Sequence, residues 1–161
     1  MRFITSAITS VILIVFSSVV FASDSSTPSQ MSAMPQMSDS NFSQAQKFIN
    51  NKEYDKAISL LEKVVSADPK NADAYNLMGY SYRQLGKLDE GIKYYQKALD
   101  INPNHKGANE YLGELYLMQG DIPKAEERLQ VLEKVCPTGC LESKILKDHI
   151  EIFKKKGIQK N

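Results

Sequence analysis

The chain of 161 residues has no tryptophan, only two cysteines and two histidines, and almost no net charge. Its 20 Lys and Arg residues nearly balance 19 Asp and Glu residues, and no basic run is longer than Lys154-Lys155-Lys156. A protein that binds nucleic acid needs a basic surface to pair with phosphates, so we do not expect this class of partner. His105 and His149 are far apart in the sequence, which leaves the two thiols without the further ligands of a zinc site.

Catalytic motifs are also missing from the sequence. There is no Gly-rich phosphate loop, no His-x-x-x-His pair and no Gly-x-Ser-x-Gly nucleophile turn. Paired acids such as Glu126-Glu127 fall at polar positions of expected helices, where they form solvated faces. We therefore expect a non-catalytic protein without a cofactor.

The N-terminus has the layout of a secretory signal peptide over residues 1–22. Arg2 is followed by the apolar run Val11–Val20 and then by small residues on either side of Phe21, ending at Ala22. We expect cleavage after Ala22 and a periplasmic or secreted protein that meets the membrane only during export. The alternative is an uncleaved anchor, although the run is short for a span of about 20 apolar residues.

Residues 23–39 are rich in Ser, Pro, Gln and Met and have no aromatic residue, which predicts a disordered linker. Met31, Met34 and Met37 recur at every third position within it. Thioether sulfur is a soft ligand that suits Cu(I), so a copper-handling site is an alternative function for this segment. The other explanation is a low-complexity linker in which methionine is incidental.

The rest of the chain repeats with a period of 34 residues. Pro69, Pro103 and Pro137 are spaced by this interval, as are Gly86 and Gly120. Such a period is typical of helix-turn-helix arrays. The middle unit resembles a tetratricopeptide repeat in seven residues: Tyr75, Met78, Gly79, Tyr82, Tyr95, Ala98 and Pro103. It departs from the repeat at Gly91, where the family most often has alanine.

The resemblance implies an all-α fold, an α-solenoid of three such repeats over residues 40–137, with units at about 38–71, 72–105 and 106–139. Ser40 and Asn41 are expected to cap the first helix. Gly86 is expected to end the first helix of the middle unit, and Asp121 to cap the last repeat helix. The first unit is an atypical match, as end repeats often are.

After Pro137 one more amphipathic helix is predicted over residues 140–156, followed by a tail at 157–161. A stack of repeats leaves its last apolar face uncovered, so we interpret this helix as a solvating cap. Its expected packing face consists of Leu141, Ile145, Leu146, Ile152 and Phe153. The alternative is that this face docks on a partner or on a second copy of the chain.

Cys136 and Cys140 flank the turn before the cap helix. In an oxidising exported compartment two such neighbours first suggest a disulfide. A redox-active pair usually has two intervening residues and this pair has three, so thiol exchange is the weaker interpretation.

By resemblance, a three-unit array binds its ligand in a groove lined by the first helix of each pair. The positions that usually contact ligands carry a mixture of amide, charged and apolar side chains, which suits an extended peptide. This mixture does not match the lysine- and asparagine-rich clamp of some relatives. The alternative is that these are ordinary exposed helix residues. These positions are Asn76, Tyr80, Arg83, Gln84, Glu110, Glu114 and Met118, with Gln46 and Asn50 from the first unit. We therefore expect a protein-interaction adaptor in the cell envelope, with copper or thiol-redox handling as the alternative and self-association as a further possibility.

Overall fold

The computed structural model describes residues 33–158, which form seven helices and no strand. The helices are α1 (Ala33–Asn50), α2 (Tyr54–Ala67), α3 (Ala72–Gln84), α4 (Leu88–Ile101), α5 (Lys106–Met118), α6 (Ile122–Val135) and α7 (Leu141–Ile158). In the described part of the chain no helix is both long and apolar enough to cross a membrane.

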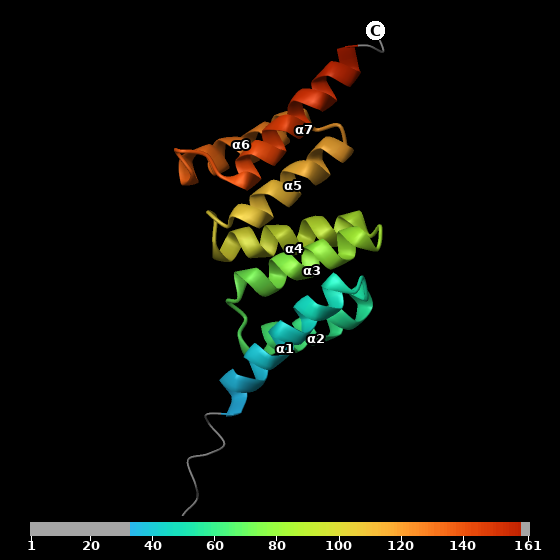
Figure 1. Ribbon diagram of the computed structural model, residues 1–161, viewed down its shortest axis with the longest axis vertical. Helices are drawn as coiled ribbons and strands as arrows, with labels where there is room; N and C mark the ends of the chain where they lie inside the picture. The colour runs from blue at the N-terminus through green and yellow to red at the C-terminus, as the bar shows by residue number, and fades with distance from the viewer. Residues whose placement is uncertain (1–32, 159–161) are drawn as a thin grey trace, which may run out of the picture.

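The helices form three hairpins that stack along the long axis of the molecule (Figure 1). The partners are α1 with α2, α3 with α4, and α5 with α6, while α7 packs against both helices of the last hairpin. This arrangement confirms the predicted all-α solenoid of three helix-turn-helix repeats with a C-terminal cap helix.

The turns inside the three hairpins share one geometry at positions 34 residues apart. Lys52, Gly86 and Gly120 each adopt the left-handed backbone conformation, with φ values of 62°, 76° and 79°. In the middle hairpin the Lys87 N–H then donates to the Tyr82 carbonyl at 2.9 Å, and both other turns contain the equivalent bond at 2.8 Å. These bonds satisfy carbonyls at the helix end, as in a Schellman motif. The sequence predicted the glycine turns, but the first hairpin uses lysine at this position.

The first helix begins earlier than the sequence suggested. α1 starts at Ala33, so Ser40 and Asn41 lie inside the helix and do not cap it, and the last residues of the predicted 23–39 linker are helical. Ser43 is bonded within the helix, its Oγ donating to the Asp39 carbonyl at 2.6 Å. Alanine, methionine and glutamine are good helix formers, which explains a helical segment without an apolar stripe. Residues 1–32, including the expected signal peptide, lie outside the described residues.

Two glycines permit close helix approaches. A Cβ on Gly79 of α3 would lie 2.7 Å from the ring of Tyr95 in α4, and a Cβ on Gly113 of α5 would lie 2.6 Å from Leu146 in α7. Because real Cβ atoms do not come this close to another side chain, each glycine makes room for a large buried partner. The first contact holds a repeat together, and the second seats the cap helix on the array.

The cap helix packs through only part of the predicted face. Leu146 and Ile150 are buried, whereas Leu141, Ile152 and Phe153 are 69%, 49% and 37% exposed. The helix also continues to Ile158, beyond its predicted end at residue 156 and into the predicted tail. Only one stripe of a helix can face its neighbours, and here it follows the packing on Gly113. The remaining apolar side chains are left at the surface.

Candidate ligand-binding groove

A hollow of about 250 Å³ opens between α3, α5 and α7, at the C-terminal end of the groove face. Its walls combine apolar and charged side chains: Arg83, Glu114, Leu117, Met118, His149, Ile152, Phe153 and Lys156. Five large apolar side chains are exposed in the described part of the chain, and three of them, Met118, Ile152 and Phe153, line this hollow. Exposed apolar clusters that are rimmed by polar groups are interaction sites more often than the rest of a protein surface is. We call it the terminal pocket.

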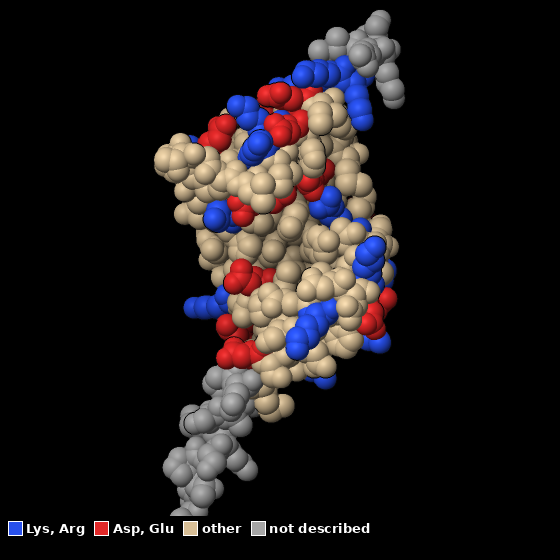
Figure 2. Space-filling view, in the orientation of Figure 1, with Lys and Arg blue, Asp and Glu red and all other residues tan. Residues whose placement is uncertain are grey.

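Glu114 fixes the polar side of the terminal pocket. Its carboxylate lies 2.6 Å from the guanidinium of Arg83 on α3 and 2.8 Å from Nδ1 of His149 on α7. The Arg83 guanidinium also lies over the ring of Tyr111, 5.7 Å from its centroid. One buried carboxylate of α5 thus connects the middle repeat to the cap helix. In Figure 2 acidic and basic groups lie close together on the upper part of the molecule.

Glu110 lies one helical turn before Glu114 and is only 6% exposed. Burial, followed by the carboxylates of Glu114 and Glu142, raises the pKa of Glu110 to about 7, and the nearby Arg83 only partly opposes this. Among the described residues Glu110 forms no ion pair. It is therefore a titratable carboxyl held between α3, α5 and α7 without a counter-ion of its own.

Tyrosines continue the groove face toward the N-terminal end. The rings of Tyr54, Tyr80, Tyr111 and Tyr95 form a chain of contacts, with successive centroids 6.3, 5.6 and 5.8 Å apart. Tyr80 is half-buried at the middle of this chain. Aromatic contacts at such distances hold the rings in place, so Tyr80 presents a fixed apolar surface.

The structure places the predicted groove residues unequally. Gln84 and Met118 are exposed, as are Gln46 and Asn50 on α1, and Tyr80 and Arg83 are partly exposed. Asn76, Glu110 and Glu114, which we also expected on the groove, are buried, and of these three Glu114 lines the terminal pocket. Asn76 lies against Gly107 at the start of α5, and its Oδ1 has no hydrogen-bond partner there. The packing of neighbouring helices leaves only a small part of each of these side chains exposed, which a single-helix pattern does not reveal.

Sequence reasoning missed the contribution of α7 to the pocket. His149, Ile152, Phe153 and Lys156 all come from the helix that we interpreted first as a cap, with docking on a partner as the alternative. A signal was present, because Ile152 follows Met118 by the repeat interval of 34 residues. The cap helix therefore continues the series α1, α3, α5 and lengthens the groove.

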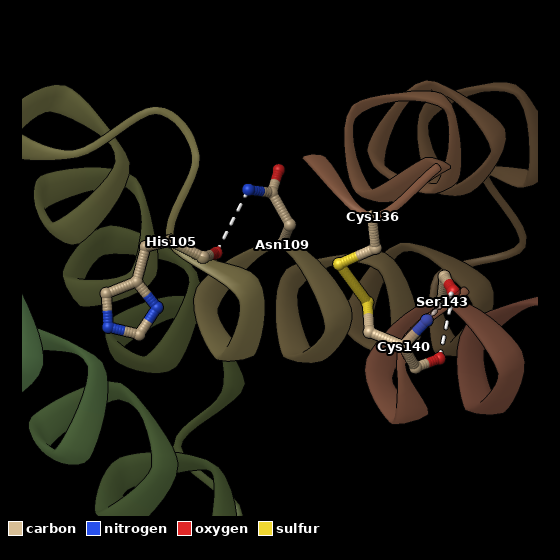
Figure 3. The surroundings of a disulfide bond; sticks show 5 residues. All are labelled: His105, Asn109, Cys136, Cys140 and Ser143. Atoms are coloured by element: carbon tan, nitrogen blue, oxygen red, sulfur yellow. Dashed lines mark hydrogen bonds between the residues drawn. A yellow bond between two sulfur atoms is a disulfide. The ribbon is translucent and has the colours of Figure 1, made fainter. Parts of the chain in front are cut away.

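The two cysteines lie where α6 gives way to α7, and the structure joins them in a disulfide (Figure 3). Their Cα atoms are 5.7 Å apart, a usual separation for such a bond. The Cys140 N–H donates to the Ser143 Oγ at 3.2 Å, and this hydroxyl donates back to the Cys140 carbonyl at 2.9 Å. The bridge and these bonds hold the first turn of α7 against the end of α6.

His105 lies outside the terminal pocket, at the start of α5. His105 caps α5, its Nδ1 accepting the Ala108 N–H at 3.1 Å, while its Nε2 lies 2.9 Å from an Asp73 carboxylate oxygen. Next to it, Asn109 donates to the His105 carbonyl at 3.0 Å (Figure 3). Within residues 33–158 no group of three or more His, Cys, Asp or Glu side chains could hold a metal ion. Of the three methionines proposed for copper, Met31 lies outside the described residues, and Met34 and Met37 are on α1.

Family models for the tetratricopeptide repeat match residues 38–71, 72–105 and 94–127. The chain belongs to the tetratricopeptide repeat family. The first two matches coincide with the expected units, and the third begins inside α4 and extends through α5.

Curated relatives share the repeats over parts of their length. Superkiller protein 3 of Saccharomyces cerevisiae is 25% identical over 105 residues, which are 65% of this chain and 7% of that protein. The uncharacterized protein ycf37 of Guillardia theta is 32% identical over 92 residues, 53% of this chain and 52% of that one. The chain therefore spans a small part of the first and about half of the second.

Solved structures of tetratricopeptide repeat domains have the same fold. The first such domain of Spaghetti (RPAP3), bound to the HSP90 peptide SRMEEVD, superposes with a TM-score of 0.67 at 17% identity, covering 75% of this chain and 93% of that one. The Sgt2 domain from Aspergillus fumigatus has a TM-score of 0.67 at 23% identity, covering 77% and 81%. At this level of identity the likeness establishes the fold alone.

Proposed function

We propose that the protein is a non-catalytic interaction module that binds an extended segment of a partner protein along α3, α5 and α7. The observation that carries this proposal is the terminal pocket, where three exposed apolar side chains surround a rigid set of charges. Apolar anchors beside fixed polar groups are the usual composition of a peptide-binding surface.

The fold supports the same function. Helices α1, α3, α5 and α7 form a continuous series along the stack, and repeat arrays commonly use such extended surfaces for binding. The RPAP3 domain, which shares this fold, is bound to a peptide in its solved structure. Side chains already held by ion pairs and aromatic contacts lose little freedom when a ligand arrives, which favours binding.

We propose the cell envelope as the place of action. This location depends on the N-terminal sequence, in which Arg2, the apolar run Val11–Val20 and Ala22 have the order of a signal peptide. Detection of a mature N-terminus at Ser23 in the periplasm or medium would support it, and retention of the unprocessed chain in the cytoplasm would contradict it.

The test of binding is a crosslinking capture from the native cell envelope with the wild type and two variants. Ile152→Asp combined with Phe153→Asp places two charges in the terminal pocket. The matched control is Leu141→Asp, which changes a more exposed apolar residue of the same helix outside the pocket. We expect a partner that the wild type and the control capture and the pocket variant loses. Equal capture by all three proteins would refute the pocket as the binding site.

A further inference from the structure

Glu110 is a buried carboxylate of the groove that has no counter-ion among the described residues. Its neighbour Glu114 contacts Arg83 and His149, whereas Glu110 has no ion pair among residues 33–158 and is only 6% exposed. Withdrawing an ionised carboxylate from water without a partner is unfavourable. A cation supplied by a ligand would therefore stabilise the ionised form of Glu110.

The charged groups around Glu110 make this part of the groove acidic. Arg83 faces it from α3, Glu114 from its own helix and Glu142 from the first turn of α7. His149 adds a titratable group on the other side of Glu114. The guanidinium of Arg83 is already paired with Glu114, so among these groups the carboxylates of Glu110 and Glu142 have no cation paired with them.

The groove is polarised along α5 and α7. Glu110 and Glu142 lie at one end, the apolar walls of the terminal pocket follow, and Lys156 borders its far side. A ligand that complements this order carries a positive charge at the first position and a large apolar side chain at the second.

We propose that the groove recognises an extended segment of a partner protein in which a lysine or arginine stands three or four residues from a large apolar residue. The basic side chain pairs with Glu110, and the apolar side chain enters the terminal pocket between Met118, Ile152 and Phe153. This inference rests on the proposed function and specifies the chemistry of the partner.

Helix geometry gives the spacing. Glu110 and Met118 are eight residues apart on α5, which corresponds to about 12 Å at a rise of about 1.5 Å per residue. An extended peptide covers that distance in three or four residues at about 3.3 Å each. Lysine and arginine have long apolar stems that reach a recessed carboxylate, and their charge-assisted hydrogen bonds are the strong ones.

The titration of Glu110 gives the interaction a characteristic pH dependence. With a pKa of about 7 in the free protein, most of the carboxyl is neutral at pH 6 and most is ionised at pH 8. A ligand cation binds the ionised form, so a basic peptide should bind about tenfold more weakly at pH 6 than at pH 8. Glu110→Gln should remove most of this difference, because the substitution leaves the contacts of Glu114 with Arg83 and His149 in place.

The experiment selects ligands from a library of random dodecapeptides displayed on phage, at pH 8, on protein expressed from the full sequence and purified. Synthetic copies of the enriched peptides are then titrated by fluorescence anisotropy against the wild type, Glu110→Gln and the control Glu127→Gln, an exposed glutamate on α6. We expect enrichment of a basic residue three or four positions from an apolar one. Glu110→Gln should weaken binding about tenfold or more, the loss of one charge-assisted hydrogen bond, and Glu127→Gln should leave it unchanged.

The outcomes separate the two proposals. Enrichment of acidic or uncharged peptides whose binding is lost in Ile152→Asp, Phe153→Asp would overturn the basic ligand and keep the groove. Enriched basic peptides that bind Glu110→Gln as tightly as the wild type would overturn the role of Glu110. Failure to enrich any sequence would count against both the peptide-binding function and this inference.

Discussion

Replacing Glu110 by glutamine should stabilise the protein at alkaline pH, because the folded chain holds this carboxyl in an environment that disfavours its charge. The pKa rises from an ordinary value of 4.5 to about 7, mainly through burial. Below pH 4.5 the carboxyl is protonated in the folded and unfolded states, and it has no effect on the pH dependence. As pH rises the unfolded chain ionises first, so stability falls until pH exceeds the folded pKa.

The size of the effect follows from this shift. Between pH 5 and pH 8 the carboxyl should lower the free energy of unfolding by about 2–3 kcal/mol, at about 1.4 kcal/mol per pKa unit. At an m-value of about 2 kcal/mol per M, this difference moves the urea midpoint by about 1 M. Urea unfolding of the wild type, Glu110→Gln and the control Glu127→Gln at both pH values measures it.

Glu110→Gln should unfold at a higher urea concentration than the wild type at pH 8 and near the wild-type midpoint at pH 5. Glu127→Gln should follow the wild type at both. If the urea midpoint of Glu110→Gln depends on pH as that of the wild type does, the Glu110 carboxyl is not buried as the structure shows. The inference about its ligand then loses its basis. A stabilising substitution at this position would agree with a residue kept for binding at the expense of stability.

Three further predictions concern the fold. Leu146→Ala should lower the free energy of unfolding by about 2–5 kcal/mol because the residue is fully buried against Gly113, whereas Leu141→Ala should change it by less than about 0.5 kcal/mol; equal effects would mean that α7 packs through another face. Lys52→Gly should raise the free energy of unfolding by about 0.5–1 kcal/mol and Gly86→Ala should lower it by about 1 kcal/mol, because both positions have a positive φ. If urea unfolding shows that Lys52→Gly destabilises the protein and Gly86→Ala stabilises it, the two turns do not share this geometry. Intact mass after alkylation should show no added groups without reductant and two with it, and two groups without reductant would reject the disulfide between Cys136 and Cys140.

The repeat architecture could be predicted from the sequence because its signals are local. Proline fixes its own φ, and glycine adopts a positive φ without steric cost, so Pro69, Pro103, Gly86 and Gly120 mark helix ends whatever the rest of the chain does. The left-handed conformation of Lys52 could not be predicted in this way because lysine rarely adopts a positive φ. The start of α1 at Ala33 was missed because the segment has helix-forming residues but no apolar stripe.

The candidate site was predicted only in part, since its character depends on which helices meet. Arg83, Glu114 and Met118 were placed on the groove face from repeat positions alone. The burial of Asn76 and Glu110, and the pairing of Glu114 with both Arg83 and His149, result from contacts between helices far apart in the sequence. The apolar residues of α7 divide between the buried face and the pocket, and this division is set by the seating of Leu146 on Gly113.

Groove binding can be tested most directly with a photo-crosslinking amino acid in place of Met118, which is 60% exposed in the terminal pocket. The same amino acid at Lys97, an exposed residue of α4 outside the pocket, is the matched control. After irradiation of cells that express each protein, we predict a discrete crosslinked product from position 118 whose partner peptide carries a basic and an apolar residue three or four positions apart. Crosslinking from position 97 and not from position 118 would contradict the proposed binding site.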